Sequence, residues 1–179
     1  NDKSIKGLFL RINSPGGSGF ASEIIRQKLE VLSQRIPIVV SMGDIAASGG
    51  YWISMNNNRL IANPFTLTGS IGVWAALPNF KKSFENIGIL FDQLSTNDLN
   101  LSILESPNEN LSSFMQSYVD GSYHKFIKLV SNSRQITIEG VEELAQGRIW
   151  SGNSAVKNNL VDSLGIFQDG IDMLKDDSG

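Results

Sequence analysis

The 179-residue sequence contains no cysteine and only one histidine, His124. The absence of cysteine excludes disulfide bonds, thiolate nucleophiles and metal sites built on cysteine. A single histidine severely limits histidine-dependent chemistry. No apolar run approaches the length of about 20 residues that a membrane-spanning helix needs.

Basic residues form no run in the chain, and the formal net charge is −3. This balance argues against a nucleic-acid partner and against binding to an anionic membrane surface. Hydrophobic residues make up 41% and charged residues 18%, a globular profile that fits one domain over 1–179. The N-terminus, NDKSIKGLFL, lacks an initiator methionine and a signal-peptide pattern, so we expect a piece of a longer protein.

Short apolar runs alternate with segments of helical periodicity along the chain. The apolar runs predict strands at 7–12, 36–42, 59–63, 70–77 and 89–94. The periodic segments predict helices at 21–34, from about Ser48, at 79–88, in a long stretch after Pro107, at 137–147 and at 167–176, with a loop at 95–110. Thr137 is a candidate N-cap and Gly147 a candidate C′ residue. The alternation is typical of an α/β fold with mostly parallel strands, right-handed crossovers and flanking helices.

Two clusters of small residues, SPGG and AASGG, fall at expected junctions between a strand and a helix. Functional loops of α/β folds gather at such junctions. Ser48, in the first turn of its helix, would have an exposed hydroxyl beside unpaired backbone N–H groups. An acyl-transfer nucleophile needs this arrangement, with the N–H of Gly49 and one from Gly16 or Gly17 holding the oxyanion. The same residues are also compatible with a tight crossing of helix and strand in which Ser48 is only an N-cap.

Four motifs that occur in sequence order add to this interpretation. They are LRINSPGGSGFASEI, VVSMGDIAASGGYWIS, ANPFTLTGSIGV and AQGRIWSGNSAVKNNLVDSLG. Together they resemble the signal peptide peptidase A (protease IV) family, serine peptidases of the Clp/crotonase superfamily. The resemblance runs from about Gly7 to Asp172 and implies a Clp/crotonase-like fold. It also implies a short form with one copy of this domain or a long form with two tandem copies, and a serine that works with a lysine base.

The resemblance implies roles for four residues. Ser48 would be the nucleophile, and the hydroxyl of Ser70 would orient the base lysine. The backbone N–H groups of Gly17 and Gly49 would hold the oxyanion. A lysine must be neutral to accept the serine proton, so such a base needs desolvation or a nearby positive charge that lowers its pKa.

Gly16 and Trp74 are the candidates for contacting substrate, Trp74 because it lies near the expected substrate strand. His124 does not match the position of the catalytic histidine of Clp protease. Asp44 and Asp92 have no partner pair, and no carboxylate cluster indicates a metal site. The sequence therefore predicts neither a metal nor a cofactor.

The base lysine is missing from the segment where short-form members carry it. That segment, FDQLSTNDLNLSILESPN at 91–108, contains no lysine. Lys81 and Lys82 are expected on a solvated helix face, and Lys125 on the long helix. The pattern resembles the second copy of the long form, which receives its lysine from the preceding copy. We therefore expect this chain to carry half an active site and to be inactive by itself.

The resemblance also implies substrate, partners and location. The substrates would be hydrophobic peptides, such as cleaved signal peptides, bound as an added strand. The preceding repeat of the parent protein would supply the lysine, and the parent would be a homo-oligomer, a tetramer in the long form. It would be anchored in the bacterial cytoplasmic membrane by a segment outside this chain, with its catalytic domain on the outer, periplasmic side.

Two alternative functions stay open. One is a crotonase-type acyl-CoA enzyme, which uses paired N–H groups without a nucleophile and gives no role to Ser48 or Ser70. The other is a non-catalytic repeat kept for assembly. A repeat without catalytic function has no need for the hydroxyl in AASGG, which argues against the second alternative.

Overall fold

The computed structural model describes residues 4–56, 58–92, 94, 96, 102–104 and 107–178. The chain divides into two compact units. The first unit comprises Asn1–Gly72 and His124–Gly179, and the second comprises Val73–Tyr123. The expectation of one domain over the whole chain stays a prediction.

The first unit is built on a six-stranded sheet. Its strands are β1 (Leu8–Ser14), β2 (Ile38–Ala47), β3 (Arg59–Ala62), β4 (Leu67–Gly69), β5 (Ile149–Ser151) and β6 (Ser163–Leu164). β2 pairs in parallel with β1, β3 and β4, and β6 pairs in parallel with β3. Only the pairing of β5 with β4 is antiparallel among the described strands. The expected α/β fold with mostly parallel strands is confirmed.

β2 has the composition of a strand that is covered on both faces. Its first six residues, IVVSMG, are all buried, as in parallel strands that carry near-continuous apolar runs. The strand runs past the expected end at residue 42 because β4 pairs with its second half, at Ile45, Ala46 and Ala47. β2 therefore ends immediately before Ser48.

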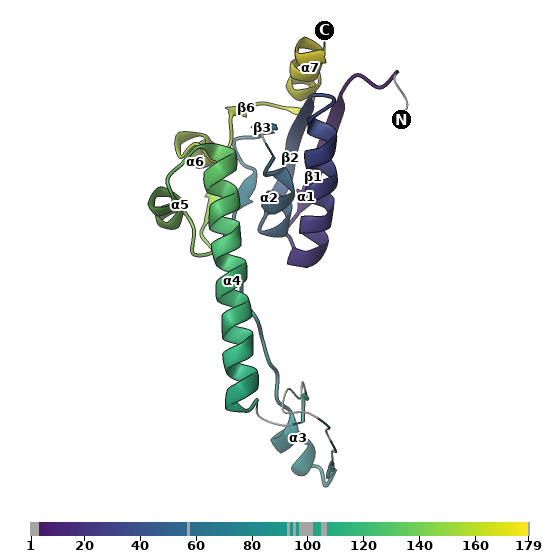
Figure 1. Cartoon of the computed structure of the whole chain (residues 1–179), viewed down its shortest axis with the longest axis vertical. Helices are drawn as coiled ribbons and strands as arrows, with labels where there is room; N and C mark the ends of the chain where they lie inside the picture. The colour runs from purple at the N-terminus through teal and green to yellow at the C-terminus, as the bar shows by residue number, and fades with distance from the viewer. Residues whose placement is uncertain are drawn as a thin grey trace. The chain divides into compact units, whose positions relative to one another are not determined.

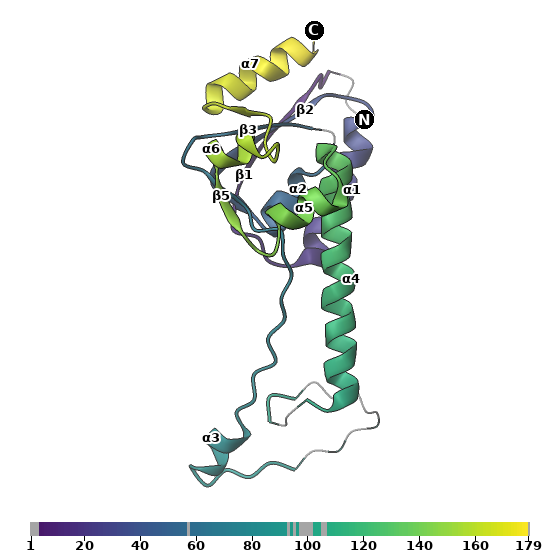
Figure 2. The same cartoon turned by 90° about the vertical axis from the view of Figure 1, so that its left-hand side faces the viewer.

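Helices flank the sheet, as Figures 1 and 2 show. In the first unit they are α1 (Gly19–Ser33), α2 (Gly49–Ser54), α5 (Ile138–Leu144), α6 (Gly152–Lys157) and α7 (Phe167–Ser178). α3 (Lys81–Glu85) belongs to the second unit, and α4 (Glu109–Arg134) begins in the second unit and ends in the first. α1 and α2 lie side by side. No helix in the described ranges is long and apolar enough to cross a membrane.

Two aromatic residues fix α2 in the core. Tyr51 is fully buried, its hydroxyl donates to the Leu160 carbonyl oxygen at 2.7 Å, and burial raises the pKa of Tyr51. The ring of Trp52 packs against Phe126 of α4, with 4.7 Å between the ring centroids. A helix of six residues is too short to be stable alone, so these tertiary contacts hold it.

The expected helices are present, with one cap corrected. Thr137 is the N-cap of α5, and its hydroxyl accepts the backbone N–H of Gly140 at 3.1 Å. Gly147 is not the C′ residue, because α5 ends at Leu144 and is capped by Ala145. The left-handed C′ position falls instead on Gln146, whose φ is 60°.

Two of the predicted strands are wrong. Residues 70–80 have no regular secondary structure, because Ser70 has a φ of 48° and ends β4. At 89–94 the described residues are exposed and pair with no described strand, and Gln93 lies outside the described residues. An apolar run becomes a strand only where a neighbouring strand is available. Much of the loop expected at 95–110 also lies outside the described residues, and α4 already begins at Glu109.

Candidate active site

Ser48 forms the turn between β2 and α2 in a strained backbone conformation. Its φ and ψ are 52° and −118°, a region that non-glycine residues rarely occupy. The backbone N–H of Ser48 donates to the Gly69 carbonyl oxygen at 2.9 Å, and its own carbonyl accepts the N–H of Trp52 at 2.8 Å. Neighbouring elements on both sides thus hold the turn, which is how strained residues of this kind persist.

Ser48 stands at the N-cap position of α2, but its side chain makes no capping hydrogen bond. Serine at an N-cap normally accepts a backbone N–H from the first turn of the helix. Ser18, at the N-cap of α1, does so by accepting the N–H of Ala21 at 3.2 Å. The half-buried hydroxyl of Ser48 is therefore not used to stabilise its helix.

The turn after β1 packs directly against Ser48. A Cβ atom on Gly16 would lie 2.6 Å from the backbone nitrogen of Gly49 and 2.8 Å from the Cβ of Ser48. A Cβ atom on Gly49 would lie 3.3 Å from the backbone nitrogen of Gly17. The two clusters of small residues found in the sequence are therefore in contact, and only glycine fits at Gly16.

The hydrogen bonds of this turn distinguish the two candidate donors, Gly16 and Gly17. The N–H of Gly16 donates to the hydroxyl of Ser14 at 3.1 Å, so it is already engaged. The N–H of Gly17 is therefore the better candidate to act together with the N–H of Gly49 as an oxyanion donor. β1 itself is held in register by Asn13, whose Oδ1 accepts the N–H of Ile45 at 3.2 Å.

Ser70 occupies the equivalent position on the neighbouring strand. Ala47 of β2 and Gly69 of β4 are partners in the sheet, so Ser48 and Ser70 each follow a paired residue directly. The N–H of Ser70 donates to the Arg148 carbonyl oxygen at 2.8 Å, which fixes its backbone against the antiparallel neighbour. The structure therefore brings Ser48 and Ser70 to the same end of adjacent parallel strands.

Other residues singled out in the sequence lie elsewhere. Trp74 belongs to the second unit and is 83% exposed. Lys81 and Lys82 are exposed on α3 of that unit, whereas Lys125 is exposed on α4 within the first unit. His124 on α4 and the carboxylates Asp44 and Asp92 are exposed as well. No group of three side chains suited to bind a metal occurs in the part of the chain that the structure describes.

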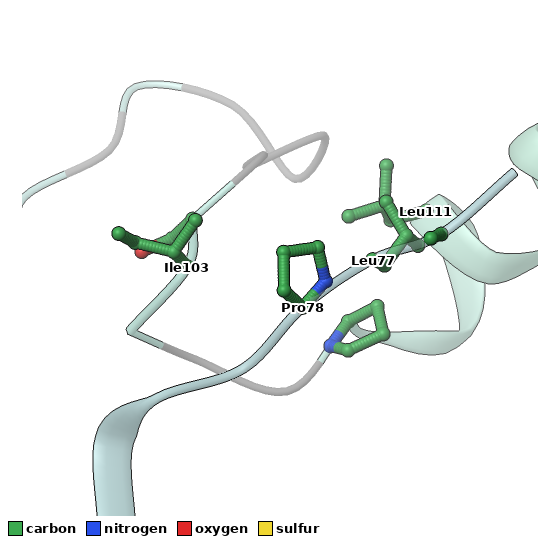
Figure 3. A pocket seen from close by; sticks show the side chains of 7 residues that line it. Leu77, Pro78, Ile103 and Leu111 are labelled. Atoms are coloured by element: carbon green, nitrogen blue, oxygen red, sulfur yellow. The ribbon is translucent and has the colours of Figure 1, made fainter. Parts of the chain in front are cut away.

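A small apolar pocket lies in the second unit. Its volume is about 120 Å³ (Figure 3). The residues that line it are Ala76, Leu77, Pro78, Ser102, Ile103, Pro107 and Leu111. None of them was a predicted site residue.

A polar network that is joined to the Ser48 turn through Trp52 was not expected from the sequence. Glu23 of α1 accepts the indole N–H of Trp52 at 2.7 Å and a hydrogen bond from Arg26 at 2.8 Å. These contacts, with that of Arg26 foremost, lower the pKa of Glu23 from 4.5 to about 2. The sequence signal was present in part, since Glu23 and Arg26 have the spacing of a helical ion pair. The bond to Trp52 joins residues far apart in the sequence.

Comparison with known proteins identifies the family. Residues 30–179 match Peptidase family S49. The chain is 44% identical over 174 residues to Protease 4 of Haemophilus influenzae, which covers 96% of this chain and 28% of that protein. It is 34% identical over 166 residues to the chloroplastic serine protease SPPA of Arabidopsis thaliana, covering 91% of this chain and 24% of that protein. The chain thus spans about a quarter of the length of these curated relatives.

The fold is similar to that of a ClpP1 mutant from Listeria monocytogenes. The TM-score is 0.61 at 15% sequence identity, and the match covers 94% of this chain and 79% of that chain. At this identity the likeness establishes the Clp/crotonase-like fold alone, whereas the sequence matches extend over most of the chain. The chain therefore belongs to Peptidase family S49, a family of serine proteases.

Proposed function

We propose that Ser48 is the nucleophile of a serine endopeptidase that cleaves hydrophobic peptides through an acyl-enzyme. The observation that carries this proposal is the positive φ of Ser48, in a turn packed against Gly16 and beside Gly17. A strained serine at a strand-to-helix turn presents its Oγ above the end of the sheet, where a substrate carbonyl can reach it. A serine that only capped α2 would need no such strain.

The proposed reaction begins with attack of the Ser48 Oγ on the substrate carbonyl carbon. The carbonyl oxygen then becomes an oxyanion, and the N–H groups of Gly17 and Gly49 are the proposed donors to it. The serine proton passes to the base and from there to the leaving amine, whose departure leaves an ester on Oγ. Water activated by the same base hydrolyses the ester and regenerates Ser48.

The proposed base is a neutral lysine from the preceding repeat of the parent protein, oriented by the hydroxyl of Ser70. Residues 91–108 contain no lysine, which supports a base from outside this chain. Lys81, Lys82 and Lys125 are exposed, and a lysine base requires a desolvated position or a nearby positive charge to be neutral. The position of Ser70, one residue beyond the partner of Ala47, supports its role beside Ser48.

The remaining parts of the proposal concern the whole protein. Its substrates are hydrophobic peptides such as cleaved signal peptides, contacted in part by Gly16 and Trp74. The parent is a homo-oligomer, a tetramer in the long form, anchored in the bacterial cytoplasmic membrane with its catalytic domain on the periplasmic side. The family resemblance supports these statements. This chain covers only 28% of the Haemophilus relative, so a parent protein of that length has room for a preceding repeat.

The test compares the full-length parent with this 179-residue chain on a hydrophobic peptide ester. We expect the parent to cleave the ester, its Ser48→Ala variant to be inactive, and the chain alone to be silent. Ser112→Ala, at an exposed serine of α4, is the matched control and should keep full activity. Ser48-dependent turnover by the chain alone would place the base within it.

Two further outcomes would refute the assignment of Ser48. One is a parent protein whose Ser48→Ala variant still cleaves the ester and still reacts with a fluorophosphonate probe. The other is hydration of an acyl-CoA by the Ser48→Ala variant, which would support the crotonase-type alternative.

A further inference from the structure

Glu23 is hydrogen bonded to the helix that begins at the proposed nucleophile. Its Oε2 accepts the indole N–H of Trp52 at 2.7 Å. Trp52 lies in α2, and its backbone N–H donates to the carbonyl oxygen of Ser48 at 2.8 Å. One residue therefore connects the Glu23 carboxylate with the Ser48 turn.

Arg26 holds the Glu23 carboxylate in a fixed orientation. Its Nε and Nη2 donate to Oε2 and Oε1 of Glu23 at 2.8 and 2.9 Å, a bidentate pair. The same guanidinium donates to Asn56 Oδ1 at 2.8 Å, and Asn56 Nδ2 donates back to the Arg26 carbonyl at 3.1 Å. The Arg26 side chain is only 11% exposed. α1 is thus tied to α2 at Trp52 and, just beyond the end of α2, at Asn56.

The same two helices adjoin the two proposed oxyanion donors. Gly17 directly precedes Ser18, the N-cap of α1, and Gly49 is the first residue of α2. The hydroxyl of buried Ser22 lies between the helices: it donates to the Ser18 carbonyl at 3.0 Å and would be 2.6 Å from a Cβ on Gly49. The packing of α1 on α2 therefore sets the spacing of the Gly17 and Gly49 N–H groups.

We infer that Glu23 is a positioning residue: through Trp52 it fixes α2 against α1, and thereby the spacing of the two N–H groups that hold the oxyanion. The inference rests on the function proposed for Ser48. Glu23 does not touch the reacting atoms, so its effect is on the geometry of the transition state. An interaction that matters only in the transition state changes kcat and leaves KM unaltered.

The test uses the full-length protein and the hydrophobic peptide ester. Trp52→Phe keeps a ring against Phe126 but removes the indole N–H, and Glu23→Gln keeps the size of the side chain but removes its charge. We expect each to lower kcat about tenfold, as loss of a hydrogen bond to a charged group does, with little change in KM. The matched control is Glu30→Gln, since Glu30 contacts the same Arg26 from a 54% exposed position. Its kcat should equal that of the wild type.

The double variant Glu23→Gln with Trp52→Phe separates positioning from unrelated damage. Trp52→Phe removes the contact that Glu23→Gln only weakens by removing the charge. The kcat of the double variant should therefore be no lower than that of the slower single variant. Active sites are counted with a fluorophosphonate probe, so that kcat refers to folded protein. The inference is overturned if both single variants keep kcat within about twofold of the wild type, or if the two losses multiply in the double variant.

Ser48→Ala, assayed in parallel, distinguishes failure of this inference from failure of the proposed function. If Ser48→Ala retains activity, the proposed function fails and the inference fails with it. If Ser48→Ala is inactive while the Glu23 and Trp52 variants keep a normal kcat, only the positioning role is refuted.

Discussion

At the scale of single residues, the candidate site depends on a position where no side chain fits. A Cβ on Gly16 would lie 2.6 Å from the nitrogen of Gly49, and Gly16 has a φ of 106°. We expect Gly16→Ala to lower peptidase activity by about 100-fold, because it displaces the Ser48 turn. We also expect it to lower the free energy of unfolding by about 1–3 kcal/mol through backbone strain. Ester cleavage and thermal unfolding of the full-length protein measure the two effects.

Gly88→Ala is the matched control for this substitution. Gly88 also has a positive φ, 78°, but no atom lies within 4 Å of the position that its Cβ would take. Gly88→Ala therefore introduces backbone strain without a collision between the new Cβ and its neighbours. We expect it to cause a small loss of stability and to leave activity unchanged. If Gly88→Ala impaired activity as strongly as Gly16→Ala, contact with the Ser48 turn would not be the cause.

A second prediction at this scale concerns the buried hydroxyl of Tyr51. Tyr51→Phe leaves the Leu160 carbonyl oxygen without its 2.7 Å donor, and both residues are fully buried. We expect a loss of about 1–2 kcal/mol in the free energy of unfolding, measured with urea. Tyr118→Phe, at a position 57% exposed, should change stability by less than about 0.5 kcal/mol. Equal effects of the two substitutions would contradict the assigned hydrogen bond.

At the scale of elements, the contact between α1 and α2 makes stability depend on pH. The pKa of Glu23 falls from 4.5 to about 2 in the folded protein, chiefly through its bond to Arg26. The stabilisation is therefore fully present above about pH 4.5 and is lost as the pH falls towards 2. After discounting for solvent screening, it is worth about 1–2 kcal/mol.

The measurement is the free energy of unfolding between pH 6 and pH 3, in the wild type and in Glu23→Gln. The difference between the two proteins should shrink as the pH falls, because protonated Glu23 resembles glutamine. Glu30→Gln, which is more exposed, is the control for a general effect of charge. A constant difference over this range would show that Glu23 keeps an ordinary pKa.

The elements also show what could be predicted from the sequence. The proximity of SPGG and AASGG could be foreseen, because residues that follow neighbouring parallel strands meet at one end of the sheet. The contact between Glu23 and Trp52 could not, because periodicity does not say how α1 is rotated against α2. β5, β6 and α6 span two to six residues, too few to give a pattern. Residues 70–77 were misread because Ser70 turns left-handed where the apolar pattern continues.

At the scale of the whole molecule, the two units differ in how well their backbone is covered. No described residue of 73–110 is buried, whereas β2 is buried over most of its length. We expect the amide hydrogens of 73–92 to exchange with solvent much faster than those of 38–47, since exchange follows local burial and hydrogen bonding. Hydrogen exchange of this chain, read by mass spectrometry, measures both segments in one sample. Equal protection would mean that another chain covers the second unit in solution.

The positive φ of Ser48 has a consequence for the history of the sequence. Glycine adopts such a conformation without steric penalty, so the backbone of the turn would favour glycine at this position. Serine stands there instead, its hydroxyl unused for capping the helix. A population of sequences selected for folding alone should drift towards glycine at this site. The presence of serine there points to a selective demand that comes from outside the fold.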